Sequence, residues 1–173
     1  RMSEWVKNVP GVPDYTVDAF REKRSDYCLL IPIINEGKRI LTELERAQKG
    51  AVDGLCDIIL CDGGSTDGSM EAEGLVRRGV NTLLTKKGPG KQGAQLRMGI
   101  HYALERGYEG ILTIDGNNKD SIESVPLFIE KLEEGYDLIQ GSRFIPGGKA
   151  VNTPFSRYWA VRLIHGPVIS LAA

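Results

Sequence analysis

The chain has 173 residues, of which 41 % are hydrophobic and 26 % charged, with a formal net charge of −1. These values favour one folded globular domain and exclude a general electrostatic attraction to nucleic acid. No apolar run approaches the ~18 residues of a membrane-spanning helix, and no secretory signal is recognisable.

The first part of the chain predicts a surface segment, a buried strand and a helix. Residues 1–25 are polar and contain two prolines, so we expect them to cover the domain surface. Residues 27–34 are apolar almost throughout, as in a strand that is covered on both faces. Asn35 is a suitable cap for a helix at about 37–49, where apolar residues recur with helical spacing.

The rest of the chain alternates between strands and helices. The predicted elements are a strand at 55–61, a helix through 70–76, a strand at 80–84, a glycine-rich basic loop at 86–90, a helix at about 91–106, a strand at 110–114, a helix that starts at Pro126 and stops at Gly135, and a strand at 136–139. Ser124 is the expected cap of the helix that starts at Pro126. This alternation predicts an α/β fold, a Rossmann-like three-layer sandwich with a mostly parallel central sheet.

Polar residues follow each of the five predicted strands. They are Asn35-Glu36, Asp62, Lys86-Lys87, Asp115 and the stretch from Gln140 to Arg143. Right-handed crossovers bring the carboxyl ends of parallel strands to one edge, where open α/β sheets bind ligands. We therefore expect these residues to converge on one site.

The segment Asp62-Gly63-Gly64-Ser65-Thr66-Asp67-Gly68 is the most informative of these strand ends. It combines an acidic residue, a glycine turn and residues that favour the start of a helix. A tight turn with a good helix cap is the alternative interpretation of the same residues.

Both signs of charge at these strand ends suit a nucleotide diphosphate. Carboxylates can bind base and ribose groups, cations can bind phosphates, and a divalent metal can join the two. The loop Lys87-Gly88-Pro89-Gly90-Lys91-Gln92-Gly93 has neither the Walker A spacing nor the G-x-G-x-x-G pattern, which argues against P-loop hydrolysis and dinucleotide binding.

Five motifs together resemble family 2 inverting glycosyltransferases with the GT-A fold, within them the dolichol-phosphate mannosyltransferase-like and polyprenyl-phosphate glycosyltransferase-like enzymes. The motifs span about residues 26–157. They are Pro32-Ile33-Ile34-Asn35-Glu36, the Asp62–Gly68 segment, Gly90-Lys91-Gln92-Gly93-Ala94, Ile114-Asp115-Gly116-Asn117 and Gly141-Ser142-Arg143-Phe144.

The resemblance implies a role for each matched position. The base and ribose would lie against Pro32, Asn35, Glu36, Asp62 and Gly63. Lys91 would lie near the ribose or the diphosphate, and Gly116 would also belong to the donor site. Arg143 would face either the diphosphate or an acceptor phosphate. Asp115 and Asn117 occupy the D-x-D positions that hold sugar, metal and diphosphate.

The D-x-D positions of this chain depart from the family pattern. Asn117 replaces the second carboxylate, and an amide is a weaker ligand for Mg²⁺ or Mn²⁺. Lys119 could offset diphosphate charge in place of a metal, or Asp120 could restore the missing carboxylate. If the acceptor is a hydroxyl, Asp115 and Asp120 are the candidate bases. A metal-assisted site of weakened affinity is the interpretation we favour.

The expected function is inverting transfer of a sugar from a nucleotide-diphosphate sugar to an acceptor such as a polyprenyl phosphate. The alternative is a nucleotide-sugar-binding module without transfer activity; a nucleotidyltransferase is more distant, because no glycine-rich basic loop follows the first strand. We expect a catalytic domain at 26–150 and an acceptor-side or membrane-proximal segment at 151–173, with the chain truncated after Ala173.

The cysteines and the resemblance predict the setting of the protein. Cys28, Cys56 and Cys61 lie in or beside predicted strands, which favours reduced core thiols and the cytoplasm. The acceptor class extends the expected partners to a membrane surface at its cytoplasmic face, and a homo-oligomer is left open.

Overall fold

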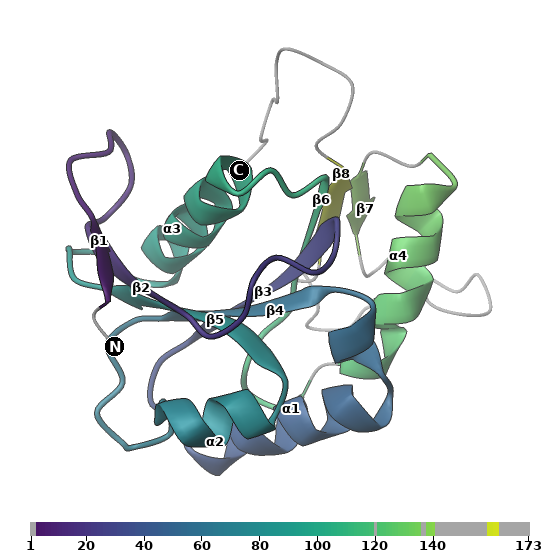
Figure 1. Cartoon of the computed structure of the whole chain (residues 1–173), viewed down its shortest axis with the longest axis horizontal. Helices are drawn as coiled ribbons and strands as arrows, with labels where there is room; N and C mark the ends of the chain where they lie inside the picture. Colours follow the sequence, from purple (N-terminus) through teal and green to yellow (C-terminus); the bar gives the residue numbers. More distant parts are fainter. Residues whose placement is uncertain (1–2, 120, 136–137, 141–158, 163–173) are drawn as a thin grey trace.

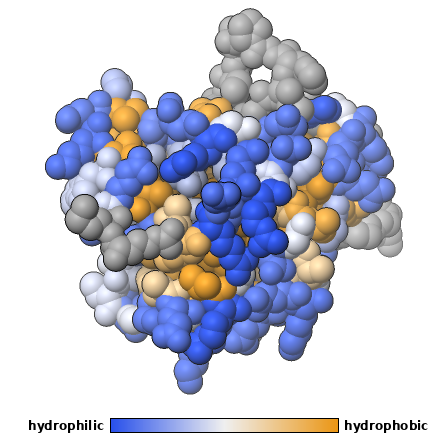
Figure 2. Space-filling model, in the orientation of Figure 1, coloured by the Kyte–Doolittle hydropathy of each residue, from blue (hydrophilic) through white to orange (hydrophobic). Residues whose placement is uncertain are grey.

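The computed structural model describes residues 3–119, 121–135, 138–140 and 159–162. One β-sheet passes through the middle of the molecule, and helices cover both of its faces (Figure 1). Hydrophilic residues cover most of the face seen in Figure 2, where the hydrophobic ones form separate patches. Within these described ranges, none of the helices has the length and apolar character needed to cross a bilayer.

The sheet is parallel at its centre and antiparallel at both sides. The strands are β1 Glu4–Val6, β2 Tyr15–Ala19, β3 Tyr27–Ile33, β4 Asp57–Asp62, β5 Val80–Lys86, β6 Gly110–Thr113, β7 Leu138–Gln140 and β8 Trp159–Arg162. Their order across the described part of the sheet is β1-β2-β5-β4-β3-β6-β8-β7. The neighbours β5, β4, β3 and β6 are parallel, and the outer strands pair antiparallel. The mostly parallel central sheet predicted from the sequence is confirmed.

The helices form two layers around this sheet. They are α1 Lys38–Lys49, α2 Ala72–Arg77, α3 Gln92–Glu105 and α4 Val125–Glu133, with short 3-10 helices η1 Val52–Gly54 and η2 Ile122–Ser124. Residues of α1, α2 and α4 share one apolar cluster with the sheet, and residues of α3 share the cluster on the opposite face. Figure 1 shows α3 on one side of the sheet and α1 and α2 on the other, so the three-layer sandwich is confirmed.

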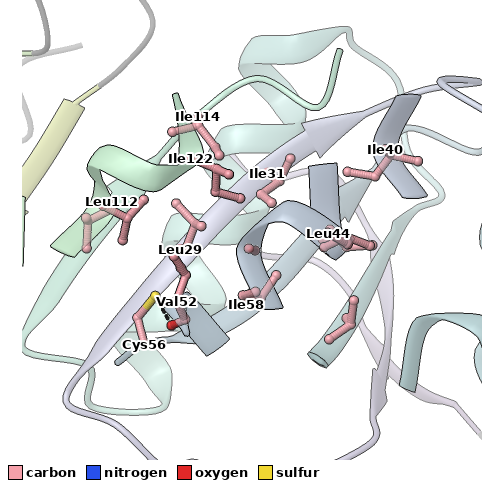
Figure 3. Close-up of a cluster of buried hydrophobic side chains, with 14 of the residues drawn as sticks. Leu29, Ile31, Ile40, Leu44, Val52, Cys56, Ile58, Leu112, Ile114 and Ile122 are labelled. Atoms are coloured by element: carbon pink, nitrogen blue, oxygen red, sulfur yellow. Dashed lines mark hydrogen bonds between the residues drawn. The ribbon is translucent and has the colours of Figure 1, made fainter. Parts of the chain in front are cut away.

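Strand β3 is buried on both faces, which explains its nearly continuous apolar sequence. Leu29 and Ile31 lie in the cluster that includes Ile40 and Leu44 of α1 (Figure 3). Leu30 points to the other face and packs in the cluster with α3. Alternate residues of one strand therefore join both layers of helices.

The N-terminal residues do more than cover the surface. Strand β2 pairs antiparallel with β5, and β1 pairs with β2. Tyr15 and Val17 of β2 are buried in the cluster beneath α3. Sequence reasoning missed these strands because both are short and lie among polar and proline residues.

Several predicted elements have different bounds in the structure. The strand predicted at 55–61 begins at Asp57, because residues 52–54 form η1 and Leu55 is 43 % exposed. The strand predicted at 80–84 continues to Lys86. The last predicted strand, at 136–139, is β7 at Leu138–Gln140.

The pairing of β3 with β6 ends earlier than the pairing of β3 with β4. The last β3–β6 pair is Leu30 with Thr113, whereas β3 stays paired with β4 as far as Ile33 and Asp62. Pro32 is buried just beyond the last β3–β6 pair, so its missing N–H leaves no bond of that ladder unmade. The helix that follows β3 and the helix that precedes β6 lie on opposite faces. This is the switch point where α/β sheets bind ligands.

Candidate functional site

The carboxyl ends of the parallel strands meet beside this switch point. Asp62 is the last residue of β4 and pairs in register with Ile33 of β3 and Thr85 of β5. The N–H of Gly63 donates to the carbonyl of Ile33 at 2.8 Å. Asp115 follows the end of β6 by two residues. The strand ends from β3, β4, β5 and β6 therefore converge, as the sequence predicted.

Asp62 is buried, with 2 % of its surface exposed, and its carboxylate organises the loop that follows. The N–H of Ser65 lies 3.1 Å from Oδ1 and 3.0 Å from Oδ2, and the Ser65 hydroxyl donates to Oδ1 at 2.5 Å. The tight-turn interpretation of this segment is thus partly correct. The turn and a ligand-binding role are compatible, because a carboxylate has about four acceptor positions.

The loops after β3 and β4 are bonded to each other by short polar side chains. The N–H of Thr66 donates to Asn35 Oδ1 at 2.8 Å, and the N–H of Asn35 donates to Ser65 Oγ at 2.9 Å. The N–H of Gly37 donates to Asp67 Oδ2 at 2.9 Å. Hydrogen bonds from Ser69 and then from Gly37 to this carboxylate hold the pKa of Asp67 below its usual value.

These contacts correct the expected helix caps. The cap position of α1 is Gly37, without a side-chain bond, and Asn35 bonds to the neighbouring loop instead. Helix α2 begins at Ala72, and its cap is Glu71 rather than a residue of the Ser65–Asp67 run. Ser124 precedes α4 but makes no capping bond either. Short polar side chains suit both caps and loops, so preference alone did not distinguish the two uses.

Helix α3 points its N-terminus at the same strand ends. Lys91 is the cap residue of α3, it makes no side-chain capping bond, and it is exposed. Gln92 Nε2 donates to Asp115 Oδ1 at 3.1 Å. A helix N-terminus carries partial positive charge and N–H donors, which favours a phosphate group beside Asp115.

Gln95 fixes this end of α3, and sequence reasoning did not identify it. Its Nε2 donates to carbonyls at the carboxyl ends of β3 and β4, those of Ile33 (2.6 Å) and Cys61 (2.9 Å). A Cβ added at Gly63 would lie 3.1 Å from the Gln95 amide, so glycine there permits the close approach. A glutamine inside a helix carries no motif, and no sequence signal marked this role.

The basic residues after β5 make hydrogen bonds within their own loop and to the N-terminal part of the chain. Lys86 Nζ donates to the carbonyl of Gly88 at 2.9 Å. The N–H groups of Lys87 and Gly88 both donate to the carbonyl of Asp14, at 2.7 and 3.0 Å. The Lys87 side chain is exposed. The loop is therefore anchored to the N-terminal strands by its backbone.

The turn after β6 carries the D-x-D positions. Gly116 is buried against β3, while Asp115 and Asn117 are partly exposed. Asn117 Oδ1 accepts a hydrogen bond from the N–H of Lys119 at 3.0 Å, and the Lys119 side chain is exposed.

The remaining predicted site residues differ in how far the structure describes them. Glu36 is partly buried, and Arg39 Nε lies 2.9 Å from its Oε2. Asp120 and Arg143 lie outside the described residues, as does the Gly141–Phe144 motif. Their assigned roles stay predictions.

The donor atoms at this turn suit a metal only together with a ligand. In the described ranges, no three His, Cys, Asp or Glu side chains group so that they could hold a metal ion. Asp115 offers a carboxylate and Asn117 an amide oxygen. Magnesium commonly binds through one or two carboxylates plus substrate phosphates. The residues therefore fit a metal that arrives with a nucleotide diphosphate.

The three cysteines are free and buried, which confirms the prediction of core thiols. Burial raises the pKa of each thiol well above its ordinary value. Such thiols are protonated and belong to the packing of the sheet rather than to a metal site.

Comparisons with known proteins find relatives among the glycosyltransferases. No model of a known protein family matches it. The chain is 30 % identical over 131 residues to the undecaprenyl-phosphate mannosyltransferase of Micrococcus luteus, covering 74 % of this chain and 52 % of the relative. It is 25 % identical over 132 residues to the polyprenol monophosphomannose synthase of Mycolicibacterium smegmatis, covering 75 % and 49 %.

A solved structure supports the same fold. Glucosyl-3-phosphoglycerate synthase from Mycobacterium tuberculosis, in complex with Mn²⁺, UDP and glucosyl-3-phosphoglycerate, matches with a TM-score of 0.55 at 21 % identity. The match covers 83 % of this chain and 57 % of that one. The chain spans between 36 % and 52 % of the length of the curated relatives that it matches.

These findings confirm the resemblance drawn from the motifs. The curated relatives are named as mannosyltransferases, a glycosyltransferase and a polyprenol monophosphomannose synthase. The fold of this chain is also that of a solved glucosyl-3-phosphoglycerate synthase. The chain is a homologue of polyprenyl-phosphate mannosyltransferases and other glycosyltransferases, and it has the GT-A fold.

Proposed function

We propose that the chain is the donor-binding catalytic part of an inverting glycosyltransferase that uses a nucleotide-diphosphate sugar. The observation that carries this proposal is the convergence of Asp62, Asp115 and the N-terminus of α3 beside the β3–β6 switch point. The names of the curated relatives support transfer rather than binding alone, so the alternative of an inactive binding module is not favoured.

The nucleoside half of the donor binds at the ends of β3 and β4. Asp62 accepts from base N–H groups, because Ser65 leaves acceptor capacity on Oδ2. Pro32 and Glu36 lie at the end of β3 on the ribose side, with Asn35 and Gly63 forming the backbone around them. The bonds between the two loops hold this half in place before the ligand arrives.

The diphosphate binds between the N-terminus of α3 and the turn after β6. Lys91, Gly116 and Lys119 face the phosphates from these two segments. Asp115 and Asn117 would hold a Mg²⁺ or Mn²⁺ ion that comes with the donor, and the bound ion would stabilise negative charge on the leaving diphosphate. The solved neighbour that contains Mn²⁺ and UDP supports this class of ligand.

The acceptor is a polyprenyl phosphate or a similar lipid phosphate, as the names of the relatives suggest. A phosphate oxygen is already anionic near neutral pH, so the attack needs no strong general base. Positioning and charge stabilisation then account for the rate, and in-line attack inverts the anomeric centre. Arg143 and Asp120 are the further residues that we assign to the acceptor side and to the metal.

The same acceptor class suggests where the enzyme works. A lipid phosphate remains in a bilayer, so we propose that the protein acts at the cytoplasmic face of a membrane. Contact with that surface falls to the segment at 151–173, most of which lies outside the described residues.

The test is transfer by the purified chain. GDP-mannose, UDP-glucose and related donors are offered with a short polyprenyl phosphate, and the product is followed by mass spectrometry and by the anomeric NMR coupling. We expect a donor-dependent lipid phosphate sugar of inverted configuration and a lower rate with chelator. A retained configuration would contradict the mechanism. If chelator does not change donor binding by wild type but Lys119→Gln abolishes donor binding, Lys119 takes the place of the metal.

Binding provides a second measurement on the same site. Asp62→Ala should weaken nucleoside diphosphate binding in calorimetry by roughly 1–3 kcal/mol, as expected for losing a buried polar partner. Asp26→Ala is the matched control, because Asp26 is an exposed carboxylate just before β3, at the opposite edge of the sheet. Unchanged affinity in a folded Asp62→Ala would remove Asp62 from the site.

A further inference from the structure

Helix α1 contacts both halves of the proposed donor site. Gly37, directly before α1, donates to Asp67 in the loop on the nucleoside side. Farther along the helix, the Ile40 side chain lies close to Gly116 on the diphosphate side. One rigid element thus lies under both loops.

Arg46 of α1 also contacts the segment that follows β6. Its Nε donates to Glu123 Oε1 at 2.8 Å, and its Nη2 donates to Glu123 Oε2 at 2.6 Å. Its Nη1 donates to Asn118 Oδ1 at 2.7 Å. Bidentate arginine–carboxylate pairs fix geometry as well as adding energy. Arg46 therefore joins α1 to two points on the segment that follows β6.

Asn118 has an unusual backbone conformation. Its φ is +62°, in the left-handed region that residues other than glycine rarely adopt. It directly follows Asn117, and so it closes the turn that carries Asp115. Holding the Asn118 side chain helps to keep this turn in one arrangement.

We propose that Arg46 is a positioning residue, which holds the turn at residues 115–118 in the arrangement that receives the donor diphosphate. This inference rests on the proposed function and adds to it a residue that touches neither donor nor acceptor. The loop network on the nucleoside side does not involve Arg46. Loss of Arg46 should therefore weaken recognition of the diphosphate and spare recognition of the nucleoside.

A double-mutant cycle tests this assignment. Calorimetry is run on wild type, Arg46→Met, Asn118→Gly and the double variant with GDP and UDP, and with guanosine and uridine. Asn118→Gly removes the hydrogen bond but accepts the positive φ. Each single variant should bind the diphosphate about tenfold more weakly, as when an outer-shell partner is lost. The double variant should be no weaker than Arg46→Met, because Asn118→Gly removes only a contact that Arg46→Met has already removed. Nucleoside affinity should stay within about twofold of wild type, inside the usual error of such cycles.

Arg78→Met is the matched control. Arg78 also pairs with α1, through Glu45 at 3.1 Å, but it does not contact the turn after β6. Its diphosphate affinity should equal that of wild type. Urea unfolding of every variant separates lost binding from lost stability.

The outcomes separate this inference from the proposed function. If wild type binds neither diphosphate, the proposed function is wrong and the assignment of Arg46 is overturned with it. If wild type binds a diphosphate but folded Arg46→Met or Asn118→Gly binds it equally well, the proposed function stands and only the role of Arg46 is refuted. An equal loss for nucleoside and diphosphate, or additive losses in the double variant, would likewise overturn it.

Discussion

Gly116 illustrates how a site residue can be fixed by packing. A Cβ added at Gly116 would collide with Cγ2 of Ile33 and lie 3.2 Å from Cγ2 of Ile31, both in β3. The position therefore requires glycine for lack of space. The sequence resemblance placed Gly116 beside the diphosphate, and the structure adds a steric reason for the residue.

We predict that Gly116→Ala lowers the free energy of unfolding by about 1–3 kcal/mol, the usual range for overpacking a rigid core. Because Ile33 is a strand residue, the turn would have to move instead, so nucleoside diphosphate binding should also weaken. Urea unfolding and calorimetry measure both effects. Gly54→Ala is the control, since nothing lies within 4 Å of a Cβ added there. Equal stability of the two variants would show that the turn absorbs the methyl group freely.

Residues at strand ends could be predicted, and residues inside helices could not. Asp62 and Asp115 follow apolar runs that are recognisable as strands. Their proximity could therefore be predicted from the geometry of a parallel sheet alone. Arg46 and Gln95 lie within amphipathic helices, where arginine and glutamine are ordinary. Their partners are 72 and 62 residues away in sequence, at Asn118 and Ile33, and only the fold brings them into contact.

At the scale of elements, the close packing of α3 on the sheet depends on one small residue. A Cβ added at Gly99 of α3 would lie 2.6 Å from Sγ of Cys61 in β4 and 3.1 Å from Cδ1 of Leu30 in β3. Glycine is a poor helix former, by about 1 kcal/mol relative to alanine. The helix accepts this loss because it lets α3 approach the strands whose ends form the site.

Gly99→Ala sets these two effects against each other. The gain in helix propensity is about 1 kcal/mol, whereas overpacking costs about 1–3 kcal/mol, so we expect net destabilisation. In a Cys61→Ala background the sulfur is gone and only the contact with Leu30 remains, so the same change should destabilise the protein much less. Urea unfolding of the four proteins gives the coupling energy. An identical effect of Gly99→Ala in both backgrounds would show that Cys61 does not limit the approach.

Sequence patterns located the central strands but did not predict how the loops after them are bonded. The alternation of apolar runs located β3, β4, β5 and β6 with small errors at their ends. The polar run after β4 was expected to start a helix, but it forms bonds to the loop after β3 before α2 begins at Ala72. Local preferences cannot reveal such a choice, because the competing partners come from a distant part of the chain.

For the whole molecule, the central sheet followed from periodicity, but its width did not. Strands β1 and β2 add to one side, and β8 and β7 to the other, all by antiparallel pairing. Such short outer strands depend on the already formed centre for their stability, so their own sequences carry little signal. The domain boundaries at 26 and 150 remain predictions.

Buried acidic groups link the stability of the whole domain to pH. Burial raises the pKa of Tyr15 above its ordinary value. Burial, and then the hydrogen bond to Asp57, raise the pKa of Tyr108. Burial also raises the pKa of the three core thiols. In the unfolded chain these groups ionise near pH 8.5 for thiols and near pH 10 for phenols.

The sign of the pH dependence follows from proton counting. Above these unfolded pKa values the folded protein binds more protons than the unfolded chain, so the free energy of unfolding falls as pH rises. Stability should therefore be complete below about pH 8.5 and decline above it, more steeply beyond about pH 10. Each group adds a slope of up to about 1.4 kcal/mol per pH unit between its unfolded and its folded pKa.

Tyr108→Phe tests this linkage at one group. The free energy of unfolding of the variant should be lower by about 1.5–3 kcal/mol near neutral pH, because the buried Asp57 carboxylate no longer accepts a hydrogen bond from Tyr108. Above pH 10, however, its stability should fall less steeply than that of wild type, by up to about 1.4 kcal/mol per pH unit. Urea unfolding at intervals between pH 7 and pH 11 measures both curves. Parallel curves above pH 10 would mean that the Tyr108 phenol ionises as readily in the folded protein as in the unfolded chain, and that its burial does not contribute to the alkaline limit of the fold.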